Sequence, residues 1–389
     1  MTRSNWTAVW VLFAGGLTAG MQLTKVPPAL PAMRVELGLT LVESGFVQTM
    51  VYTIGAATAV FFGTAADRFG QRHAALAGLV LMTLGGLLGT AARGFGLLLG
   101  SRFLEGVGFV FFTVGAAPLL AAATLPKDRA TAFSLWSSYM PAGGTLALLF
   151  APAALATVGW RGLWLGVAAY TALCAALLVR FVPPAPFGGG TGSIRLLAES
   201  VSRPGALALC VAFICYVGQW ASVMTWLPTF AVGERNAGAS TAALLTAAFV
   251  AINIPGNQLG GLLLKHGASR AAVLAWGAVA MGVTSVGLLS APAPDWLRLT
   301  CALAFSFLGG VIPAAAFSGT TVHAKSSAHI GTMNGMLMQA SHLSQFVLPV
   351  SVAWVASRSG SWSASLGLML SLAAIGVLAA LAVGRIEQR

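Results

Sequence analysis

The chain has 389 residues, of which 57% are hydrophobic and only 8% are charged. So few charged side chains cannot cover the surface of a water-soluble protein of this size, which excludes a soluble protein. The 21 lysines and arginines outnumber the 9 aspartates and glutamates and give a net charge of +12, but they are scattered singly, so membrane topology explains them better than nucleic-acid binding.

Apolar runs bounded by glycine, proline or charge predict twelve transmembrane helices, because a bilayer core about 30 Å thick needs roughly 20 helical residues per crossing. The first run is too long for a cleaved signal peptide and is expected to remain as a helix. The predicted helices cover residues 8–29, 41–62, 74–91, 96–121, 132–156, 163–182, 205–230, 239–263, 271–290, 299–321, 333–356 and 363–384.

One polar interruption, rich in proline and glycine, separates six predicted helices from six. It predicts an N-terminal bundle over residues 1–182, a cytoplasmic linker over 183–203 and a C-terminal bundle over 204–389. With the N-terminus inside, thirteen lysines and arginines fall on the cytoplasmic side and six on the outer side. This asymmetry predicts that both termini are cytoplasmic, in the inner (plasma) membrane of the cell.

Two weak internal repeats support a duplicated, pseudo-symmetric fold. Gly63 and Gly70, after the second predicted helix, align with Gly260 and Gly267, after the eighth, at an offset of 197. Residues 103–107 in the fourth predicted helix align with 307–311 in the tenth at an offset of 204. The fold class predicted is therefore an all-α membrane protein with two pseudo-symmetric six-helix bundles.

Three motifs resemble a known family. Gly63-x-x-x-Asp67-Arg68-x-Gly70-Gln71-Arg72 resembles the loop 2–3 signature of the major facilitator superfamily, and Arg102-x-x-Glu105-Gly106-x-Gly108 resembles its helix 4 signature. Gly159-Trp160-Arg161 is a third common feature. Shorter strings, among them Leu135-Trp136-Ser137, Trp226-Leu-Pro-x-Phe230 and Met338-Gln339, look like the cyanate/nitroimidazole permease branch. The resemblance implies a secondary transporter that works by alternating access.

Two departures from the superfamily's signatures bear on the mechanism. Met140-Pro141-Ala142-Gly143-Gly144 lacks the first glycine of the antiporter signature and is one residue short, which disfavours drug/proton exchange. The first predicted helix contains no acidic residue and so lacks the motif of aromatic-acid/proton symporters.

Two cations lie inside predicted helices, at similar depths of about 6 and 9 Å below the outer ends. Charges in hydrocarbon are costly and need a reason, so Lys25 and Arg102 predict a positive zone that binds an anionic substrate. Two alternatives remain open. Lys25 is near enough to the outer interface to snorkel, and Arg102 can form a structural ion pair with Glu105, three residues on.

Glu105 is the one carboxylate predicted in the membrane interior and therefore the candidate proton carrier. An anion that captures Arg102 would leave Glu105 desolvated and favour its protonation, which predicts anion/proton symport. A permanent ion pair is the alternative.

Polar uncharged groups are expected to complete the substrate site. On the eleventh predicted helix Gln339, His342 and Gln345 share one face, and His342 is either a proton relay or a packing hydrogen bonder. Trp220 could instead belong to an interfacial aromatic belt. In the helix predicted at 239–263, Pro255-Gly256 can break the helix beside Asn253. The predicted substrate-binding residues are Gln22, Lys25, Arg102, Tyr139, Gln219, Trp220, Asn253, Gln339 and His342.

The family resemblance also implies a cytoplasmic gate formed by Asp67, Arg68 and Arg72, in which Asp67 latches the inner gate closed at a helix N-terminus. A solvated loop carboxylate is the alternative.

The sequence disfavours other functional classes of membrane protein. None of the four lysines lies in a phosphate-binding Gly-Lys-Ser/Thr context, which disfavours a primary pump. One internal carboxylate and one mid-membrane histidine are too few for an intramembrane enzyme, and no cofactor or metal site is indicated. The partners expected are a small-molecule anion, a proton and membrane lipid, with the protein as a monomer. The remaining alternatives are a uniporter or exchanger of a small neutral solute and a non-transporting receptor.

Overall fold

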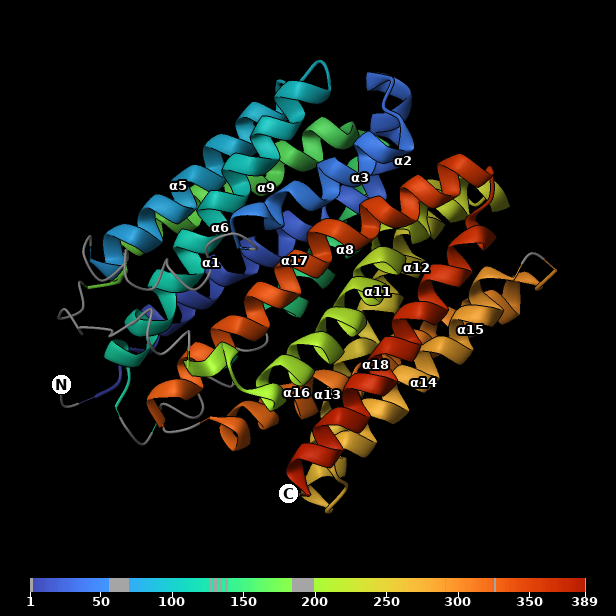
Figure 1. Ribbon diagram of the computed structural model, residues 1–389. Coiled ribbons are helices and arrows are strands. Elements are labelled where there is room, and N and C mark those ends of the chain that lie inside the picture. Colours follow the sequence, from blue (N-terminus) through green and yellow to red (C-terminus); the bar gives the residue numbers. More distant parts are fainter. Residues whose placement is uncertain are drawn as a thin grey trace. The chain divides into compact units, whose positions relative to one another are not determined.

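The structure, a computed structural model, is almost entirely helical (Figure 1). It describes residues 3–55, 70–125, 128, 132, 135–136, 139–183, 199–290, 292–324 and 327–388. The helices of the first half are α1 (Trp6–Thr24), α2 (Val26–Leu37), α3 (Leu41–Thr49), the 3-10 helix η1 (Met50–Tyr52), α5 (Gln71–Thr90), α6 (Phe95–Ala123), α8 (Tyr139–Thr157) and α9 (Gly159–Phe181). Those of the second half are α11 (Pro204–Arg235), α12 (Ala239–Ala251), α13 (Asn253–Lys265), α14 (Arg270–Leu289), α15 (Asp295–Gly309), α16 (Val311–His323), α17 (Ser327–Ser359), the 3-10 helix η2 (Trp362–Ser365) and α18 (Leu366–Glu387).

In the described part of the chain, ten helical segments are long and apolar enough to cross a membrane by length and composition. Two of the twelve predicted spans are not among them. The span predicted at 41–62 runs beyond residue 55, where that described stretch ends. The span predicted at 333–356 lies within the 33 residues of α17, whose glutamine, histidine and serine side chains lower its hydropathy. The prediction of an all-helical, multi-pass membrane protein is confirmed.

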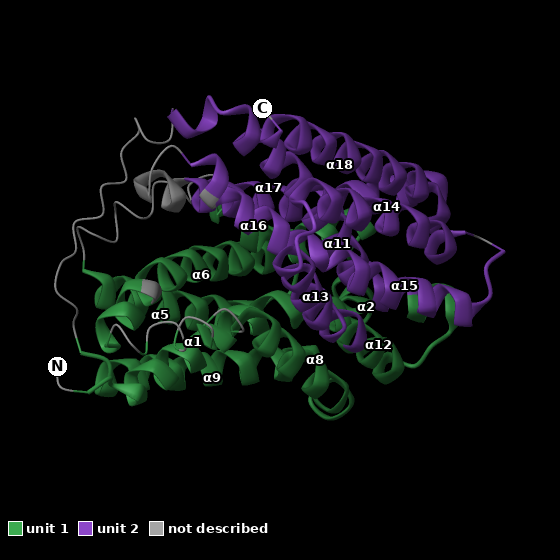
Figure 2. Ribbon diagram, turned by 90° about the horizontal axis from the view of Figure 1, so that it is seen from below, with its two compact units in different colours: residues 1–191, 231–247 green, residues 192–230, 248–389 purple. Residues whose placement is uncertain are grey.

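The chain divides into two compact units, shown in green and purple in Figure 2. Unit 1 is Met1–Thr191 with Ala231–Ala247, and unit 2 is Gly192–Phe230 with Ala248–Arg389. In unit 1, α1 packs against α6, α8 and α9, and α5 packs against α6 and α9. In unit 2, α14 packs against α15, α16 and α18, while α13 packs against α15 and α16. Most of the predicted linker, residues 184–198, lies outside the described residues.

The prediction of one continuous helix over 8–29 is wrong, because the helix breaks at Lys25 between α1 and α2. Pro27 and Pro28 follow the break, and a proline has no backbone N–H to donate to the residue four positions earlier. Pro27 therefore donates no hydrogen bond to the Leu23 carbonyl, which instead accepts one of 3.2 Å from Gln48 Nε2. The break places the Lys25 side chain at a helix junction inside unit 1.

Two further predicted helices are also divided by proline. The helix predicted at 239–263 breaks at Ile252, three residues before Pro255, which confirms the break expected there. The helix predicted at 299–321 breaks at Gly310, three residues before Pro313, where no break was predicted.

Glycines at corresponding repeat positions have the same local geometry. Gly70 and Gly267, offset by 197, both have a positive φ, of 82° and 91°, a region that side chains disfavour. Gly106 and Gly310, offset by 204, both lie against a neighbouring backbone: a Cβ atom on Gly106 would be 2.4 Å from the Val51 oxygen, and one on Gly310 would be 2.9 Å from the Asn253 oxygen. These positions therefore repeat in structure as well as in sequence.

Gly106→Ala is expected to destabilise the protein by about 1–3 kcal/mol, because its methyl group would push α6 away from η1. Gly100→Ala is a matched control on the same helix, since a Cβ there meets nothing within 4 Å. The melting temperatures of the purified variants check this. Equal melting temperatures of the two variants would show that the backbone at Val51 moves away from the added methyl group without loss of stability.

Candidate functional site

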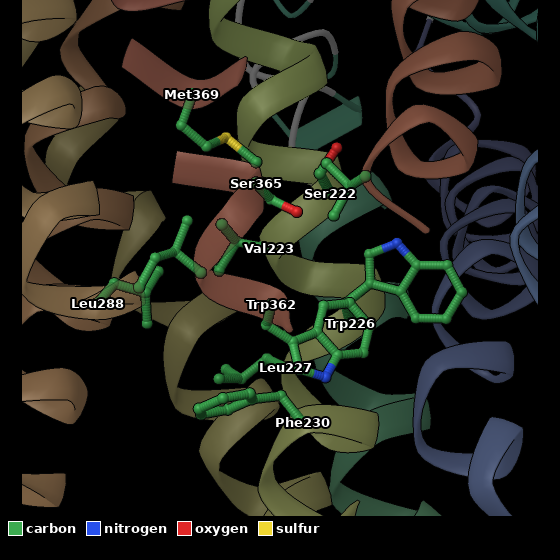
Figure 3. Close-up of a pocket in the computed structure, with 11 residues that line it drawn as sticks. Ser222, Val223, Trp226, Leu227, Phe230, Leu288, Trp362, Ser365 and Met369 are labelled. Carbon is green, nitrogen blue, oxygen red and sulfur yellow. The ribbon is translucent and has the colours of Figure 1, made fainter. Parts of the chain in front are cut away.

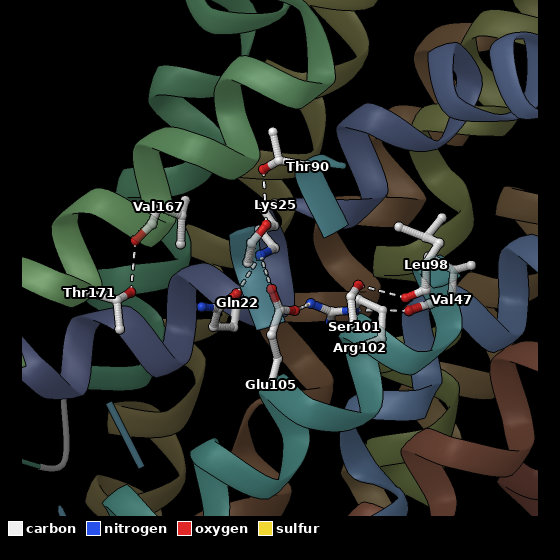
Figure 4. A network of polar contacts seen from close by, with 11 residues as sticks. Gln22, Lys25, Val47, Thr90, Leu98, Ser101, Arg102, Glu105, Val167 and Thr171 are labelled. Atoms are coloured by element: carbon white, nitrogen blue, oxygen red, sulfur yellow. Dashed lines mark hydrogen bonds and ion pairs between the residues drawn. The ribbon is translucent and has the colours of Figure 1, made fainter. Parts of the chain in front are cut away.

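A buried ion-pair triad lies in unit 1 (Figure 4). Lys25 Nζ donates to Glu105 Oε1 at 2.6 Å, and Arg102 Nη1 donates to Glu105 Oε2. All three side chains are 0% exposed. The lysine comes from the α1–α2 junction, whereas Arg102 and Glu105 are one turn apart on α6. The helix break and the i,i+3 spacing thus bring two cations to one carboxylate.

Neighbouring groups fix both cations. Gln22 Oε1, one turn earlier on α1, accepts a hydrogen bond of 2.5 Å from Lys25 Nζ, which also lies 4.5 Å from the centre of the Trp164 ring of α9. Such a cation–π contact favours the charged amine. Arg102 Nε donates to the Val47 carbonyl of α3 at 3.0 Å. The arginine is therefore bound both to its own helix and to α3.

The triad carries two cations against one carboxylate. The desolvation cost of burying an ion pair already offsets most of the attraction between its two charges. An additional buried charge adds a further desolvation cost. The Arg102–Glu105 ion pair considered in the sequence analysis is present in the structure, whereas its purely structural role stays a prediction. The alternative of a snorkelling Lys25 is wrong, because its side chain is fully buried. Since both cations bind Glu105 here, neither is an open anion ligand in this structure.

Hydrogen-bond donors around the triad exceed acceptors. Among the described residues, Gln22 Nε2, Arg102 Nη2 and Trp164 Nε1 are buried and have no hydrogen-bond partner. Buried donors are normally satisfied, by protein or by water. The surroundings of the triad are thus rich both in positive charge and in unused donors, which favours a negatively charged or acceptor-rich species nearby.

The sequence did not reveal the Lys25–Glu105 bond, which joins residues 80 positions apart. The bond could have been predicted from the similar depths estimated for Lys25 and Arg102, because two cations at the depth of one carboxylate can both pair with it.

In unit 2, two predicted site residues, Trp220 and Asn253, form a polar cluster with Ser306 and Tyr216. Asn253 Nδ2 donates to the Ser306 carbonyl at 2.7 Å, and the Asn253 side chain also bonds the Tyr216 hydroxyl. Trp220 Nε1 donates to Ser306 Oγ at 2.9 Å, so this tryptophan is bonded inside the unit rather than serving only as part of an interfacial belt. Gln219, 1% exposed, donates to the Cys215 carbonyl of its own helix at 3.0 Å.

The remaining predicted substrate-binding residues are Tyr139, Gln339 and His342. Tyr139 packs against Trp136 with the rings tilted by 38° and their centres 4.4 Å apart. Gln339 and His342 are half-buried on α17, where Gln345 donates to Ser341.

Of the predicted gating residues, Arg72 is described, whereas Asp67 and Arg68 lie outside the described residues. Arg72 Nη2 donates to the Val179 carbonyl at 2.6 Å and so ties the start of α5 to the last turns of α9.

The Gly159-Trp160-Arg161 feature forms a clamp at the other end of these helices. Trp160 Nε1 donates to Glu36 Oε2 at 2.6 Å, and Arg161 Nη1 pairs with Glu36 Oε1. Arg161 also donates to the carbonyls of Thr90, at 3.1 Å, and Ala92, at 2.7 Å, at the C-terminal end of α5. The clamp therefore joins α2, α5 and α9.

The hydrogen bond from Trp160 and the pairing with Arg161 hold the pKa of Glu36 below its usual range. Because the folded-state pKa is depressed, the clamp contributes stability above the ordinary carboxyl pKa and loses it as pH falls through the folded value. We expect the melting temperature to fall on acidification below about pH 4.5, and Glu36→Gln to remove part of that fall. The effect is modest, since Glu36 is 48% exposed and screened by solvent. An unchanged pH profile in Glu36→Gln would contradict this role.

Unit 2 also contains an apolar crevice, and Figure 3 draws the residues that line it. No charged side chain is among its described lining residues, and Ser222, one of its two hydroxyls, donates to Gly218 of its own helix. The crevice therefore does not provide ligands for an ion. Its lining residues are Ser222, Val223, Trp226, Leu227, Phe230, Leu288, Leu289, Val352, Trp362, Ser365 and Met369.

Comparison with known proteins decides the family. A family model described as Major Facilitator Superfamily matches residues 12–349. The chain belongs to the major facilitator superfamily. The two motif resemblances and the third feature are thus confirmed at the level of the superfamily, whose members here are transporters and not enzymes. The finer resemblance to the cyanate/nitroimidazole permease branch stays a prediction.

Curated relatives of this major facilitator protein include the purine ribonucleoside efflux pump NepI of Escherichia coli O127:H6 (strain E2348/69 / EPEC), 25% identical over 68% of this chain and 67% of that protein. The methylenomycin A resistance protein of Bacillus subtilis (strain 168) is 29% identical over 42% of this chain and 36% of that protein. A probable 4-methylmuconolactone transporter of Cupriavidus pinatubonensis (strain JMP 134 / LMG 1197) is 26% identical over 60% and 56%. The matches thus span between 36% and 67% of the relatives' lengths.

Solved structures share the fold of this superfamily member. A bacterial homolog to the human lysosomal transporter Spinster, in an inward-facing and unoccupied conformation, matches with a TM-score of 0.82 at 17% identity, over 97% of this chain and 96% of that one. The same homolog in an occupied conformation also gives 0.82, at 16% identity, over 98% and 96%. At these identities the likeness concerns the fold alone. Among the described residues, no group of three or more His, Cys, Asp or Glu could hold a metal ion.

Proposed function

We propose that this major facilitator protein is a secondary active transporter that carries a small univalent anion together with a proton by alternating access. The observation that supports this proposal is the Lys25–Glu105–Arg102 triad, which has a formal charge of +1 and no exposure to solvent. Such a charge is costly to bury and is best balanced by an anion.

Charge balance also supports coupling to protons. An anion attracted by the triad would be released poorly if the triad kept its positive charge in every state. A proton that binds and leaves with the anion changes the triad's charge at the right step, and linkage then makes each ligand favour the other's binding. Glu105 is the proton carrier that the sequence indicates.

The proposal includes placement in the inner (plasma) membrane, with both termini cytoplasmic and the protein monomeric. The excess of lysine and arginine in alternate loops supports this orientation. Substrate binding by Gln219, Trp220 and Asn253 stays a prediction, and within unit 2 the Trp220 Nε1 and Asn253 Nδ2 donors bond Ser306.

The relatives favour a second candidate. Two of them are named as a purine ribonucleoside efflux pump and as a resistance protein, and a purine ribonucleoside is an uncharged organic solute, so the second candidate is export of such a solute. The two candidates differ in the charge of the substrate and in the direction in which a proton gradient drives it.

Proteoliposomes with an imposed pH gradient test the proposal. Small inorganic anions and organic carboxylates are first ranked by the thermal shift they give the purified protein, with adenosine as the uncharged comparison. The proposal expects labelled anion to accumulate when the exterior is acidic, without net charge movement. Accumulation of adenosine when the interior is acidic, with no accumulation of an anion, would favour the export candidate, and counterflow of no labelled compound would favour a receptor.

A further inference from the structure

The triad contains two groups that could gain or lose the coupled proton, Lys25 and Glu105. The net charge of the triad differs according to which of the two does so. Arg102 does not lose its proton in proteins, so it contributes a constant +1. Among the described residues Glu105 is the one carboxylate paired with Arg102, and α5 approaches Glu105 with Gly85 and Gly86. Tyr52 of η1, near Arg102, is uncharged when protonated, and Gln22 and Trp164 are uncharged.

Protonation of Glu105 would increase the uncompensated charge. With Glu105 neutral, Lys25 and Arg102 would be two fully buried cations with no counterion among the described residues, a formal charge of +2. Binding of one univalent anion would still leave +1. Loss of the Lys25 proton has the opposite effect, because it leaves the neutral Arg102–Glu105 pair, which is closed within α6 and anchored to Val47.

From this charge balance and from the separate origin of Lys25, at a helix junction rather than on α6, we propose that Lys25 carries the coupled proton. The Arg102–Glu105 pair is then a fixed partner that positions the amine. The inference rests on the proposed anion/proton symport and assigns its proton to a different residue from the sequence prediction.

The two states balance in atoms and charge. In the loaded state Lys25 Nζ carries the proton and the anion offsets the triad's +1, so the sum is zero. In the empty state Nζ has given its proton to a water molecule that enters as the unit opens, the anion has left, and the sum is again zero. Lys25 Nζ donates to Glu105 Oε1 at 2.6 Å and to Gln22 Oε1 at 2.5 Å, so both acceptors hold the amine in place for the exchange.

A pH jump without any substrate tests this assignment. Liposomes that contain the full chain are adsorbed on a solid-supported membrane, and the transient current that follows a rapid pH change is measured in a zwitterionic buffer without added carboxylate or small inorganic anion. We expect a transient in the wild type that falls at least about fivefold in Lys25→Arg, which is always charged, and in Lys25→Met, which is never charged. Lys265→Arg, at an exposed lysine, should keep the wild-type transient.

A transient of wild-type size in Lys25→Arg or Lys25→Met, with the variant folded and monodisperse, overturns the inference in favour of Glu105. A wild type with no transient overturns it as well. Failure of the proposed function looks different: the transient depends on Lys25, but no anion accumulates under a pH gradient. If Lys25→Arg still accumulates anion against its gradient, the symport stands and the assignment of its proton to Lys25 fails.

Discussion

Glu105→Gln should destabilise the protein by about 3–5 kcal/mol, the cost of removing one partner from a buried ion pair. The glutamine keeps the shape of the side chain but leaves Lys25 and Arg102 as two buried cations without a counterion. Steric trapping in bicelles would measure the change in the free energy of unfolding, and the melting temperature of the purified protein would report its direction.

Two further variants separate charge from shape. Glu234→Gln makes the same substitution at an exposed carboxylate and should change stability by less than about 0.5 kcal/mol. Lys25→Met combined with Glu105→Gln restores the triad's charge of +1 and should recover part of the loss. If Glu105→Gln is as stable as the wild type, the two cations do not depend on the carboxylate, and the charge count that supports the function loses its basis.

Lys25→Met and Arg102→Met should each weaken anion binding by more than about tenfold. Each removes one cation and leaves a neutral pair, so the attraction of the triad for an anion is lost. Two unit charges about 10 Å apart at an effective dielectric constant of about 20 interact by about 1.7 kcal/mol, and 1.4 kcal/mol corresponds to a factor of ten. Calorimetric titration with the anion that most stabilises the wild type would measure the change.

The combined variant Lys25→Met with Glu105→Gln is the control for this effect as well. It keeps only Arg102 and therefore the charge of +1, so its anion affinity should return to within a few-fold of the wild type if charge is the cause. An affinity that stays low would mean that Lys25 contacts the anion directly. Unchanged affinity in both single variants, or a cationic substrate, would contradict the attraction altogether.

Much of the fold follows from the sequence alone. Apolar runs locate the spans because a backbone in hydrocarbon must satisfy its own hydrogen bonds, which leaves helices as the solution for runs of this length. Pro255 allowed the break in its helix to be predicted, and the repeated glycines at 70 and 267 both have a positive φ. The Arg102–Glu105 pair was predictable because residues three apart share a helix face.

Only the tertiary structure decided how the charges combine. Sequence spacing placed Lys25 and Arg102 at similar depths but could not give the directions of their side chains. The break after Thr24 depends on whether Gln48 replaces the hydrogen bond that Pro27 cannot make. The contact between Lys25 and Glu105 joins two helical elements, and its direction is set by the packing of α1, α6 and α9. A sequence therefore determines which charges enter the membrane, whereas packing between helices determines which of them meet, because periodicity fixes the face of a helix only relative to itself.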